Sequence, residues 1–162
     1  MNITFLGDGI FALMVFFFLL LIKKTRPAIE VLISFICSGL LAQFLKFIFH
    51  APRPKAFLEA SQYSKFFEGV TNSGWNSFPS GHTTTAFAVA TILAFYSTNT
   101  RVAVFYLLLA LLVGYSRIYL GHHFLEDVLA GAVLGLISSC LVLKLTKNNS
   151  YTFSKEKKLF IE

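Results

Sequence analysis

Charged residues are scarce in this sequence. Asp, Glu, Lys and Arg make up 14% of the 162 residues, hydrophobic residues make up 56%, and the mean hydropathy is +0.68. Because soluble domains carry about 25% charged residues, this composition excludes an ordinary water-soluble domain. The sequence therefore predicts a protein whose main solvent is not water.

Cysteine is almost absent as well. Cys37 and Cys140 lie inside apolar runs, with neither a metal-type spacing nor the pattern of a disulfide framework, so we expect inert thiols in the protein core. The first 22 residues also lack the basic start and small-residue cleavage site of a secretory signal. We therefore expect this segment to be retained as part of the folded protein.

The chain has a formal net charge of +6, but its basic residues are scattered between long apolar runs. Membrane topology explains this distribution better than nucleic acid does, so no nucleic-acid partner is expected. The length fits one domain. We assign residues 1–147 to a single transmembrane domain and residues 148–162 to a basic cytoplasmic tail.

Apolar runs suited to membrane helices recur along the chain. A hydrocarbon core of about 30 Å requires about 20 helical residues. The runs at residues 83–96 and 128–143 are short, but polar residues ahead of each can continue the helix into a protein-lined cavity. We expect an all-α fold, a polytopic transmembrane helical bundle of about five membrane helices, with six possible. The five runs are residues 10–22, 28–49, 83–96, 102–120 and 128–143.

Two further patterns refine this bundle. Gly131, Gly135 and Ser139 recur at four-residue spacing, which lets two helix backbones approach closely. The region from His50 to His82 is rich in Pro, Ser, Asn, Gly and charge, and loops of this length usually carry a function. We expect it to be a long outward-facing loop.

Basic residues predict the orientation of the bundle. If five helices alternate, nine Lys and Arg residues fall on one side and five on the other, and three of those five belong to the motifs below. The positive-inside rule assigns the nine to the cytoplasm. The long loop then faces the periplasm or the exterior. The nine residues are Lys23, Lys24, Arg26, Arg101, Lys144, Lys147, Lys155, Lys157 and Lys158.

Two polar clusters interrupt the apolar background at outward helix ends. The first is Lys46 with Arg53-Pro54; alone, it fits a snorkelling lysine and a turn. The second is Pro79-Ser80-Gly81-His82, directly before an apolar run, where a helix is expected to begin. A helix start attracts phosphate through its free N–H groups, Gly81 permits close backbone approach, and Ser80 adds a hydroxyl, although the same residues also suit an ordinary helix cap.

The third cluster is the most specific. Ser116-Arg117 is followed by His123 and then by Asp127, four residues later. On a helix, residues four apart lie one above the other, so the Asp127 carboxylate can accept a hydrogen bond from one imidazole nitrogen. The other nitrogen is then an unprotonated nucleophile. A satisfied structural ion pair is the alternative, but charge at membrane depth favours a functional site.

Other polar residues are assigned no catalytic role. His122 is expected to point about 100° away from His123 on a helix, and His50 and Glu126 lie off the motif positions. Gly7-Asp8-Gly9 fits a turn or a helix N-cap. Two histidines and one aspartate among three cations suit an anion rather than a divalent metal, so neither metal nor cofactor is expected.

Together the three clusters resemble the signature of the type 2 phosphatidic acid phosphatase superfamily, also called lipid phosphate phosphatases. The order of the three clusters and the spacing within each cluster both fit this signature, which spans residues 46–127. The resemblance implies that His123 attacks phosphorus, Asp127 orients it and His82 protonates the leaving oxygen. It also implies that the phosphoryl oxygens are held by Lys46, Arg53, Ser80, Gly81 and Arg117.

The resemblance further implies hydrolysis of a membrane lipid phosphate through a phosphohistidine. Candidate substrates are phosphatidylglycerol phosphate, lipid A 1-phosphate, undecaprenyl diphosphate and phosphatidic acid. The expected location is the bacterial cytoplasmic (inner) membrane, with no obligate protein partner. Members of this superfamily commonly have six membrane helices. A count of five helices therefore leaves the front wall of the site unassigned. The alternatives are an anionic-lipid transporter or flippase that binds without hydrolysis, and a catalytically inactive structural subunit.

Overall fold

Every regular element is a helix across residues 3–57 and 74–159, which the computed structural model describes, with side chains as far as Lys147. Pro52 and Trp75 form an isolated antiparallel bridge. Most of the predicted outward loop, residues 58–73, lies outside the described residues. The helices are η1 (Ile3–Gly7), α1 (Gly9–Leu21), α2 (Thr25–Phe49), α3 (Pro54–Phe57), α5 (Gly81–Tyr96), α6 (Thr100–Tyr119) and α7 (Leu125–Leu159).

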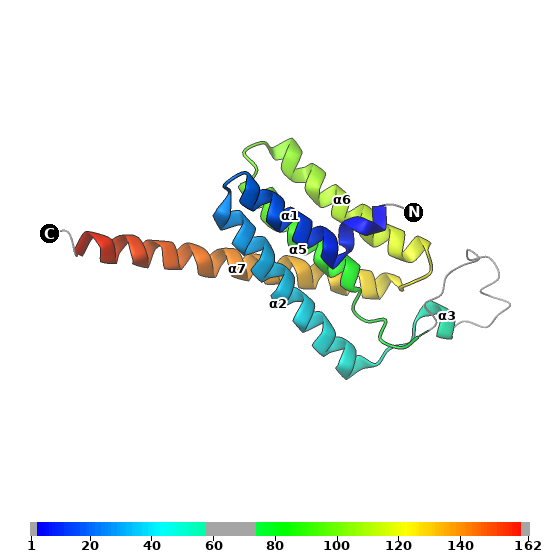
Figure 1. Cartoon of the computed structure of the whole chain (residues 1–162). Coiled ribbons are helices and arrows are strands. Elements are labelled where there is room, and N and C mark those ends of the chain that lie inside the picture. The colour runs from blue at the N-terminus through cyan, green and yellow to red at the C-terminus, as the bar shows by residue number, and fades with distance from the viewer. Residues whose placement is uncertain (1–2, 58–73, 160–162) are drawn as a thin grey trace.

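The predicted apolar runs correspond to α1, α2, α5, α6 and α7, which confirms the all-α bundle. Three of these helices contain segments long and apolar enough to cross a membrane, Thr25–Phe49, Thr100–Tyr119 and Leu125–Lys147. The apolar helix α1 has 13 residues and α5 has 16, so both are shorter. The backbone of α7 continues to Leu159, past the predicted end of the domain, and extends beyond the bundle (Figure 1).

Local sequence explains several helix boundaries. Asp8 is the N-cap of α1, where its side chain accepts the Ile10 N–H at 3.0 Å, which confirms the predicted cap. Asn99 caps α6 in the same way through the Arg101 N–H at 2.9 Å. At the end of α2, His50 has a φ of 42° and its N–H donates to Lys46. A residue in the left-handed region commonly ends a helix.

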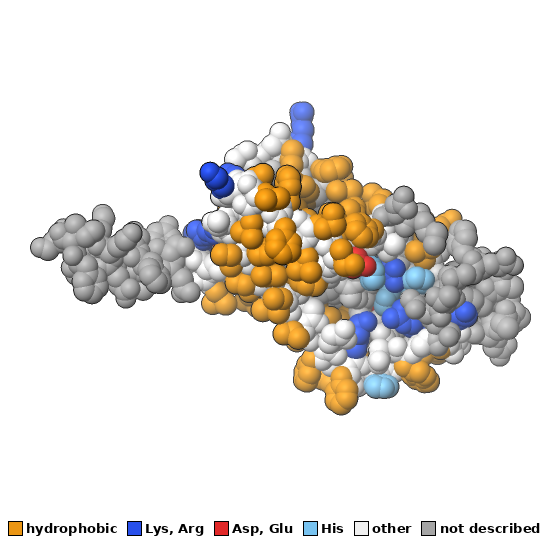
Figure 2. All heavy atoms as spheres, in the orientation of Figure 1, with side chains coloured by type: hydrophobic (Ala, Val, Ile, Leu, Met, Phe, Trp, Pro, Cys, Tyr) orange, Lys and Arg blue, Asp and Glu red, His pale blue; other side chains and the backbone are white. Residues whose placement is uncertain are grey.

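The outer surface of the bundle is apolar. Large side chains are exposed on each helix, among them Phe17 at 59%, Leu40 at 67% and Ile137 at 55%. Figure 2 shows hydrophobic side chains covering the middle of one face. An apolar surface this extensive marks contact with lipid rather than water. Cys37 and Cys140 are also exposed, so their predicted place in the core is wrong; they lie on this surface.

Helix α5 occupies the centre of the bundle, in contact with α1, α2, α6, α7 and η1 (Figure 1). Its partner α7 approaches it closely through the predicted small-residue stripe. A Cβ atom at Gly135 would lie 2.4 Å from the Thr84 carbonyl oxygen, and the Ser139 hydroxyl donates to the Ala88 carbonyl at 3.1 Å. The stripe therefore packs α7 against α5, as lipid-embedded helices require.

A buried carboxylate connects helices at the opposite end from the three motifs. Glu30 of α2 is 1% exposed and accepts hydrogen bonds from Arg26 at 3.1 Å and from Thr146 of α7 at 2.7 Å. A buried charge needs such partners. This contact fixes α2 against α7 and was not anticipated from the sequence.

Candidate active site

The three polar clusters converge at one end of the bundle. They lie at the C-terminal end of α2 and just after it, at the start of α5, at the end of α6, and in the turn before α7 and the first turn of α7 (Figure 1). Figure 2 shows Lys, Arg and His side chains gathered at this end. Lys46 is near enough to Arg53, Asp127 and Arg117 for electrostatic interaction. Residues far apart in sequence thus form one cationic site around the Asp127 carboxylate.

His123 and Asp127 form a buried pair, 3% and 1% exposed. The Oδ2 atom of Asp127 lies 3.3 Å from His123 Nδ1, accepts the Phe124 N–H at 2.9 Å and accepts the Ser77 hydroxyl at 2.5 Å. The Ser77 Oγ atom is also 3.2 Å from His123 Nδ1. The site therefore contains a three-membered network of serine, histidine and carboxylate.

The His123–Asp127 contact was predicted, but its geometric reason was wrong. His123 lies in the turn before α7, and α7 begins at Leu125, so the two residues do not occupy successive turns of one helix. Asp127 is instead the third helical residue, and its carboxylate reaches back to the backbone N–H that precedes the helix, as in a capping box. The positive end of the α7 dipole favours this carboxylate in its ionised form.

A tight turn delivers His123 to the site. Gly121 has a φ of 64°, a conformation that glycine adopts without strain, and its N–H donates to the Ile118 carbonyl at 2.8 Å. His122 follows within this turn, so the predicted rotation of His122 away from His123 does not apply. His122 interacts electrostatically with Arg117, His123 and Arg53. His50 and Glu126 are exposed, as their exclusion from the site predicted.

Each of the three cations is held by an oxygen acceptor. Lys46 Nζ donates to the Asn76 carbonyl at 3.2 Å, and Arg53 Nη1 donates to the His122 carbonyl at 3.4 Å. Arg117 is 5% exposed and donates from Nη1 to the Thr4 hydroxyl at 2.9 Å, while its buried Nε atom has no partner among the described residues. Their remaining donors are suited to an anion.

Burial and positive charge alter the titration of the groups in the connecting segments. Burial lowers the pKa of His123, while its hydrogen bond to Asp127 acts in the opposite direction. Burial, followed by the charge of Arg117, lowers the pKa of His122 to about 4. Burial also lowers the pKa of the Arg53 guanidinium from its usual value. Both histidines therefore favour the neutral form near pH 7.

The start of α5 faces this network. Ser80 is fully buried, its N–H donates to the Asp127 carbonyl at 2.9 Å, and its hydroxyl accepts from Thr83 at 2.9 Å. A Cβ atom at Gly81 would meet no protein atom within 4 Å, so this side of the helix start is open. His82 follows on α5 and interacts electrostatically with Arg117 and His123. The predicted site residues are thus brought together.

The sequence matches the PAP2 superfamily over residues 27–151. The chain belongs to this superfamily. It is 36% identical over 104 residues to a lipid A 1-phosphatase of Rhizobium johnstonii, covering 64% of this chain and 41% of that protein. It is 32% identical over 129 residues to phosphatidylglycerophosphatase B of Bacillus subtilis, covering 74% of this chain and 58% of that protein. The chain spans about half the length of these curated relatives.

The fold agrees with this membership. The crystal structure of Aquifex aeolicus LpxE superposes with a TM-score of 0.78 at 32% identity, covering 88% of this chain and 82% of that one. The PAP2 match includes all three clusters and four of the five apolar helices, α2, α5, α6 and α7 as far as residue 151. The chain is therefore a membrane protein of the PAP2 superfamily.

Two residues of this PAP2 site were missed by sequence reasoning. Ser77 lies three residues before Ser80, and Thr4 lies in η1, outside every cluster. Single Ser and Thr residues are common in any sequence, so no spacing distinguishes them. Only the fold brings Ser77 to the His123–Asp127 pair and Thr4 to Arg117.

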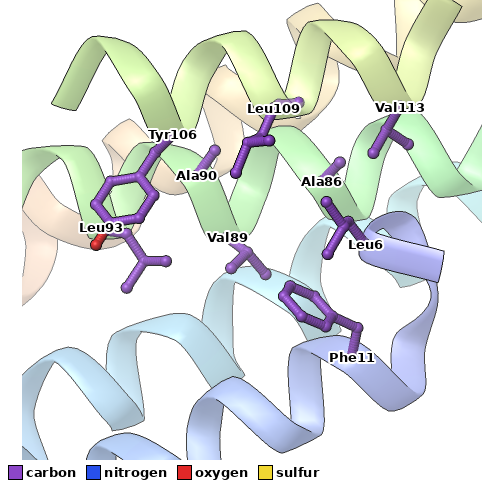
Figure 3. Close-up of a pocket in the computed structure, with 10 residues that line it drawn as sticks. Leu6, Phe11, Ala86, Val89, Ala90, Leu93, Tyr106, Leu109 and Val113 are labelled. Atoms are coloured by element: carbon purple, nitrogen blue, oxygen red, sulfur yellow. The ribbon is translucent and has the colours of Figure 1, made fainter. Parts of the chain in front are cut away.

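An apolar groove of about 100 Å³ lies elsewhere on this PAP2 chain, between η1, α1, α5 and α6. Figure 3 shows Leu6 and Phe11 facing Val89 and Ala86 of α5, with Tyr106 at the other end. Apart from the Tyr106 hydroxyl its lining is apolar and provides no cation for a phosphate, so the groove does not suit the chemistry of the three clusters. Among the described residues, no three His, Cys, Asp or Glu side chains gather closely enough to bind a metal.

Proposed function

We propose that this chain is a phosphatase that hydrolyses lipid phosphates through a phosphohistidine on His123. The observation that carries the proposal is the buried Ser77–His123–Asp127 network beside three cationic side chains. A binding protein for anions needs the cations but has no use for an oriented, neutral imidazole. Membership of the PAP2 superfamily supports the same activity.

The reaction follows from the chemistry of these groups. The Nε2 atom of His123 attacks phosphorus, and the bond from phosphorus to the lipid oxygen breaks as His82 gives that oxygen a proton. Water then attacks the phosphohistidine, His82 takes a proton from the water, and inorganic phosphate leaves with His123 restored. Lys46, Arg53 and Arg117 neutralise the equatorial oxygens, and the N–H groups at the start of α5 add fixed dipoles. These basic side chains neutralise the phosphoryl oxygens, as a metal ion does in metal-dependent phosphoryl transfer. Activity is therefore expected to survive EDTA.

The substrate class follows from the surroundings of the site. The cations lie at the end of an apolar bundle, where a lipid headgroup reaches them while its chains remain in hydrocarbon. We propose a lipid phosphate monoester or diphosphate, with phosphatidylglycerol phosphate, lipid A 1-phosphate, undecaprenyl diphosphate and phosphatidic acid as the substrates to compare. A panel of these four lipids with the purified protein would rank them.

We also propose a bacterial inner-membrane location with the site on the periplasmic or exterior side. Lys23 and Lys24 lie between α1 and α2, Arg26 lies in the first turn of α2, and Arg101 lies in the first turn of α6, all at the end opposite His123. The positive-inside rule assigns this opposite end to the cytoplasm.

Two histidine variants and one control test the mechanism. His123→Ala should abolish turnover of every substrate. His82→Ala should lower lipid hydrolysis by about 10² to 10⁴, but should retain more activity on p-nitrophenyl phosphate, whose aryl leaving group needs no proton. His50→Ala removes an exposed histidine outside the site and should leave both activities unchanged.

The variants must be compared at matched thermal stability, since a misfolded bundle would also lose activity. Full turnover by His123→Ala would refute the proposed nucleophile. Equal proportional losses on lipid and aryl substrates in His82→Ala would exclude His82 as the acid. Binding of lipid phosphate by the wild type without any phosphate release would support the transporter instead.

A further inference from the structure

The Ser77 hydroxyl occupies a defined position between the two members of the buried pair. Its side chain is fully buried, with Oγ 2.5 Å from Asp127 Oδ2 and 3.2 Å from His123 Nδ1. The Ser77 N–H donates to the Ala51 carbonyl at 2.9 Å, which ties this segment to the chain that leaves α2. Both the backbone and the side chain of Ser77 are therefore fixed.

Counting protons decides the direction of each hydrogen bond. A serine hydroxyl has one proton to donate, whereas an ionised carboxylate can only accept. The Ser77 proton must therefore point to Asp127, which leaves an oxygen lone pair facing His123. That lone pair accepts a hydrogen bond only if Nδ1 of His123 carries a hydrogen. In the neutral imidazole, Nε2 is then the unprotonated nitrogen.

We propose that Ser77 is a positioning residue for His123, holding the imidazole in the tautomer whose Nε2 atom can attack phosphorus. Ser77 shares the Nδ1 hydrogen with Asp127. The role in turnover rests on the proposed phosphatase function, whereas the tautomer does not depend on it. Once Nε2 bonds phosphorus, the ring becomes cationic, so the hydrogen bond from Nδ1 to Ser77 becomes charge-assisted and the one to the Asp127 carboxylate joins two opposite charges, and both strengthen. Ser77 therefore stabilises the phosphohistidine more than the resting enzyme.

Asp127 alone provides weaker restraint. Its Oδ2 atom is 3.3 Å from Nδ1 and already accepts from Phe124 and Ser77, so the direct bond to His123 is the longest of the three. The serine hydroxyl completes a chain from Nδ1–H through Oγ–H to the carboxylate, in which each hydrogen bond polarises the next.

Ser34 provides a matched control for burial and chemistry. Its side chain is also fully buried, on α2, but its hydroxyl has no hydrogen-bond partner among the described residues. Ser34 lies twelve positions before Lys46 along α2, which is about 18 Å at the helical rise. Ser34→Ala therefore removes the same hydroxyl from an equally buried position far from the site.

The kinetic test compares Ser77→Ala, Ser34→Ala, Asp127→Asn and the Ser77→Ala, Asp127→Asn double variant. Ser77→Ala should lower kcat by about 10- to 100-fold, the size expected for a hydrogen bond to a charged group, while KM stays within about twofold. Ser34→Ala should keep wild-type kcat. In the Asp127→Asn background the loss from Ser77→Ala should shrink, because both residues act through one imidazole. Multiplicative losses, or wild-type kcat in Ser77→Ala, would overturn the proposal.

A spectroscopic measurement tests the tautomer independently of activity. Imidazole ¹⁵N chemical shifts should report hydrogen on Nδ1 of His123 in the wild type and a rise of the Nε2–H form in Ser77→Ala. An unchanged tautomer population would overturn the positioning role. If the wild type hydrolyses no lipid phosphate, the proposed function fails, yet these spectra still decide the role of Ser77. If Ser77→Ala does not fold, Ser77→Cys, with a weak donor of similar size, is measured in both experiments with the same expected directions.

Discussion

Gly131 connects helix packing to the chemistry of the site. A Cβ atom at this position would lie 2.6 Å from the Ser80 carbonyl oxygen and 3.2 Å from the Thr84 hydroxyl. Ordinary van der Waals contact begins at 3.4 Å. Gly131→Ala therefore requires α7 and α5 to separate by the difference between 3.4 and 2.6 Å, about 0.8 Å, because a helix carbonyl cannot rotate away.

This separation acts directly on the candidate catalytic residues. The Ser80 N–H donates to the Asp127 carbonyl across the same interface at 2.9 Å, so moving α7 displaces Asp127 from the start of α5. Overpacking of this kind costs about 1 to 3 kcal/mol of stability. A misplacement of about 1 Å can cost about 10² in rate. We expect Gly131→Ala to lower turnover by about 10- to 100-fold.

Phosphate release and thermal unfolding in detergent test this expectation together. Gly39→Ala is the matched control, because a Cβ atom at Gly39 in α2 would meet nothing within 4 Å. It should retain activity and gain about 0.5 to 1 kcal/mol, since alanine favours helix more than glycine does. If Gly131→Ala behaved like Gly39→Ala in both measurements, the inferred coupling of helix spacing to the site would be refuted.

Three further predictions follow from the same structure. Because burial lowers the pKa of His123, its nucleophilic form persists to lower pH, and the acid limb of kcat/KM due to His123 should lie below about 6.5; a limb above this value in pH–rate profiles would contradict it. Thr4→Val removes the acceptor of the Arg117 hydrogen bond and should raise KM for lipid phosphate several-fold, whereas unchanged kinetics would show that Arg117 needs no such support. A topology reporter after Glu162 should be cytoplasmic and one near Tyr63 external, and reversal of both would refute the orientation.

The sequence alone predicted the bundle and most of the site because both depend on local patterns. Apolar runs at membrane length define the helices whatever their neighbours are, and the runs 10–22 and 102–120 match α1 and α6 within one or two residues. The spacing of Gly131, Gly135 and Ser139 also predicted a close helix contact, since small residues one turn apart share one helix face.

The sequence was less informative where a residue's role depends on its surroundings. The His123–Asp127 contact was anticipated from a helical spacing, yet it arises in a turn, where Asp127 reaches back to the Phe124 N–H. The assumption that these residues lie on one continuous helix also misplaced His122. Lipid exposure of Cys37 and Cys140 likewise depends on which helix face meets a neighbour, which apolar composition does not specify.

Residue types and their order determined that this chain forms an apolar helical bundle with three cations, two histidines and one carboxylate near helix ends. Tertiary structure alone decided that Ser77 and Thr4 join them, which helix packs beneath Ser80, and which oxygen holds each cation. The physical reason is the separation along the chain over which each kind of interaction acts. Hydrophobicity and helix periodicity act within about 20 residues of chain. Hydrogen bonds of 3.2 and 2.5 Å join Ser77 to His123 and Asp127, which lie 46 and 50 positions away, and only packing brings these residues within reach.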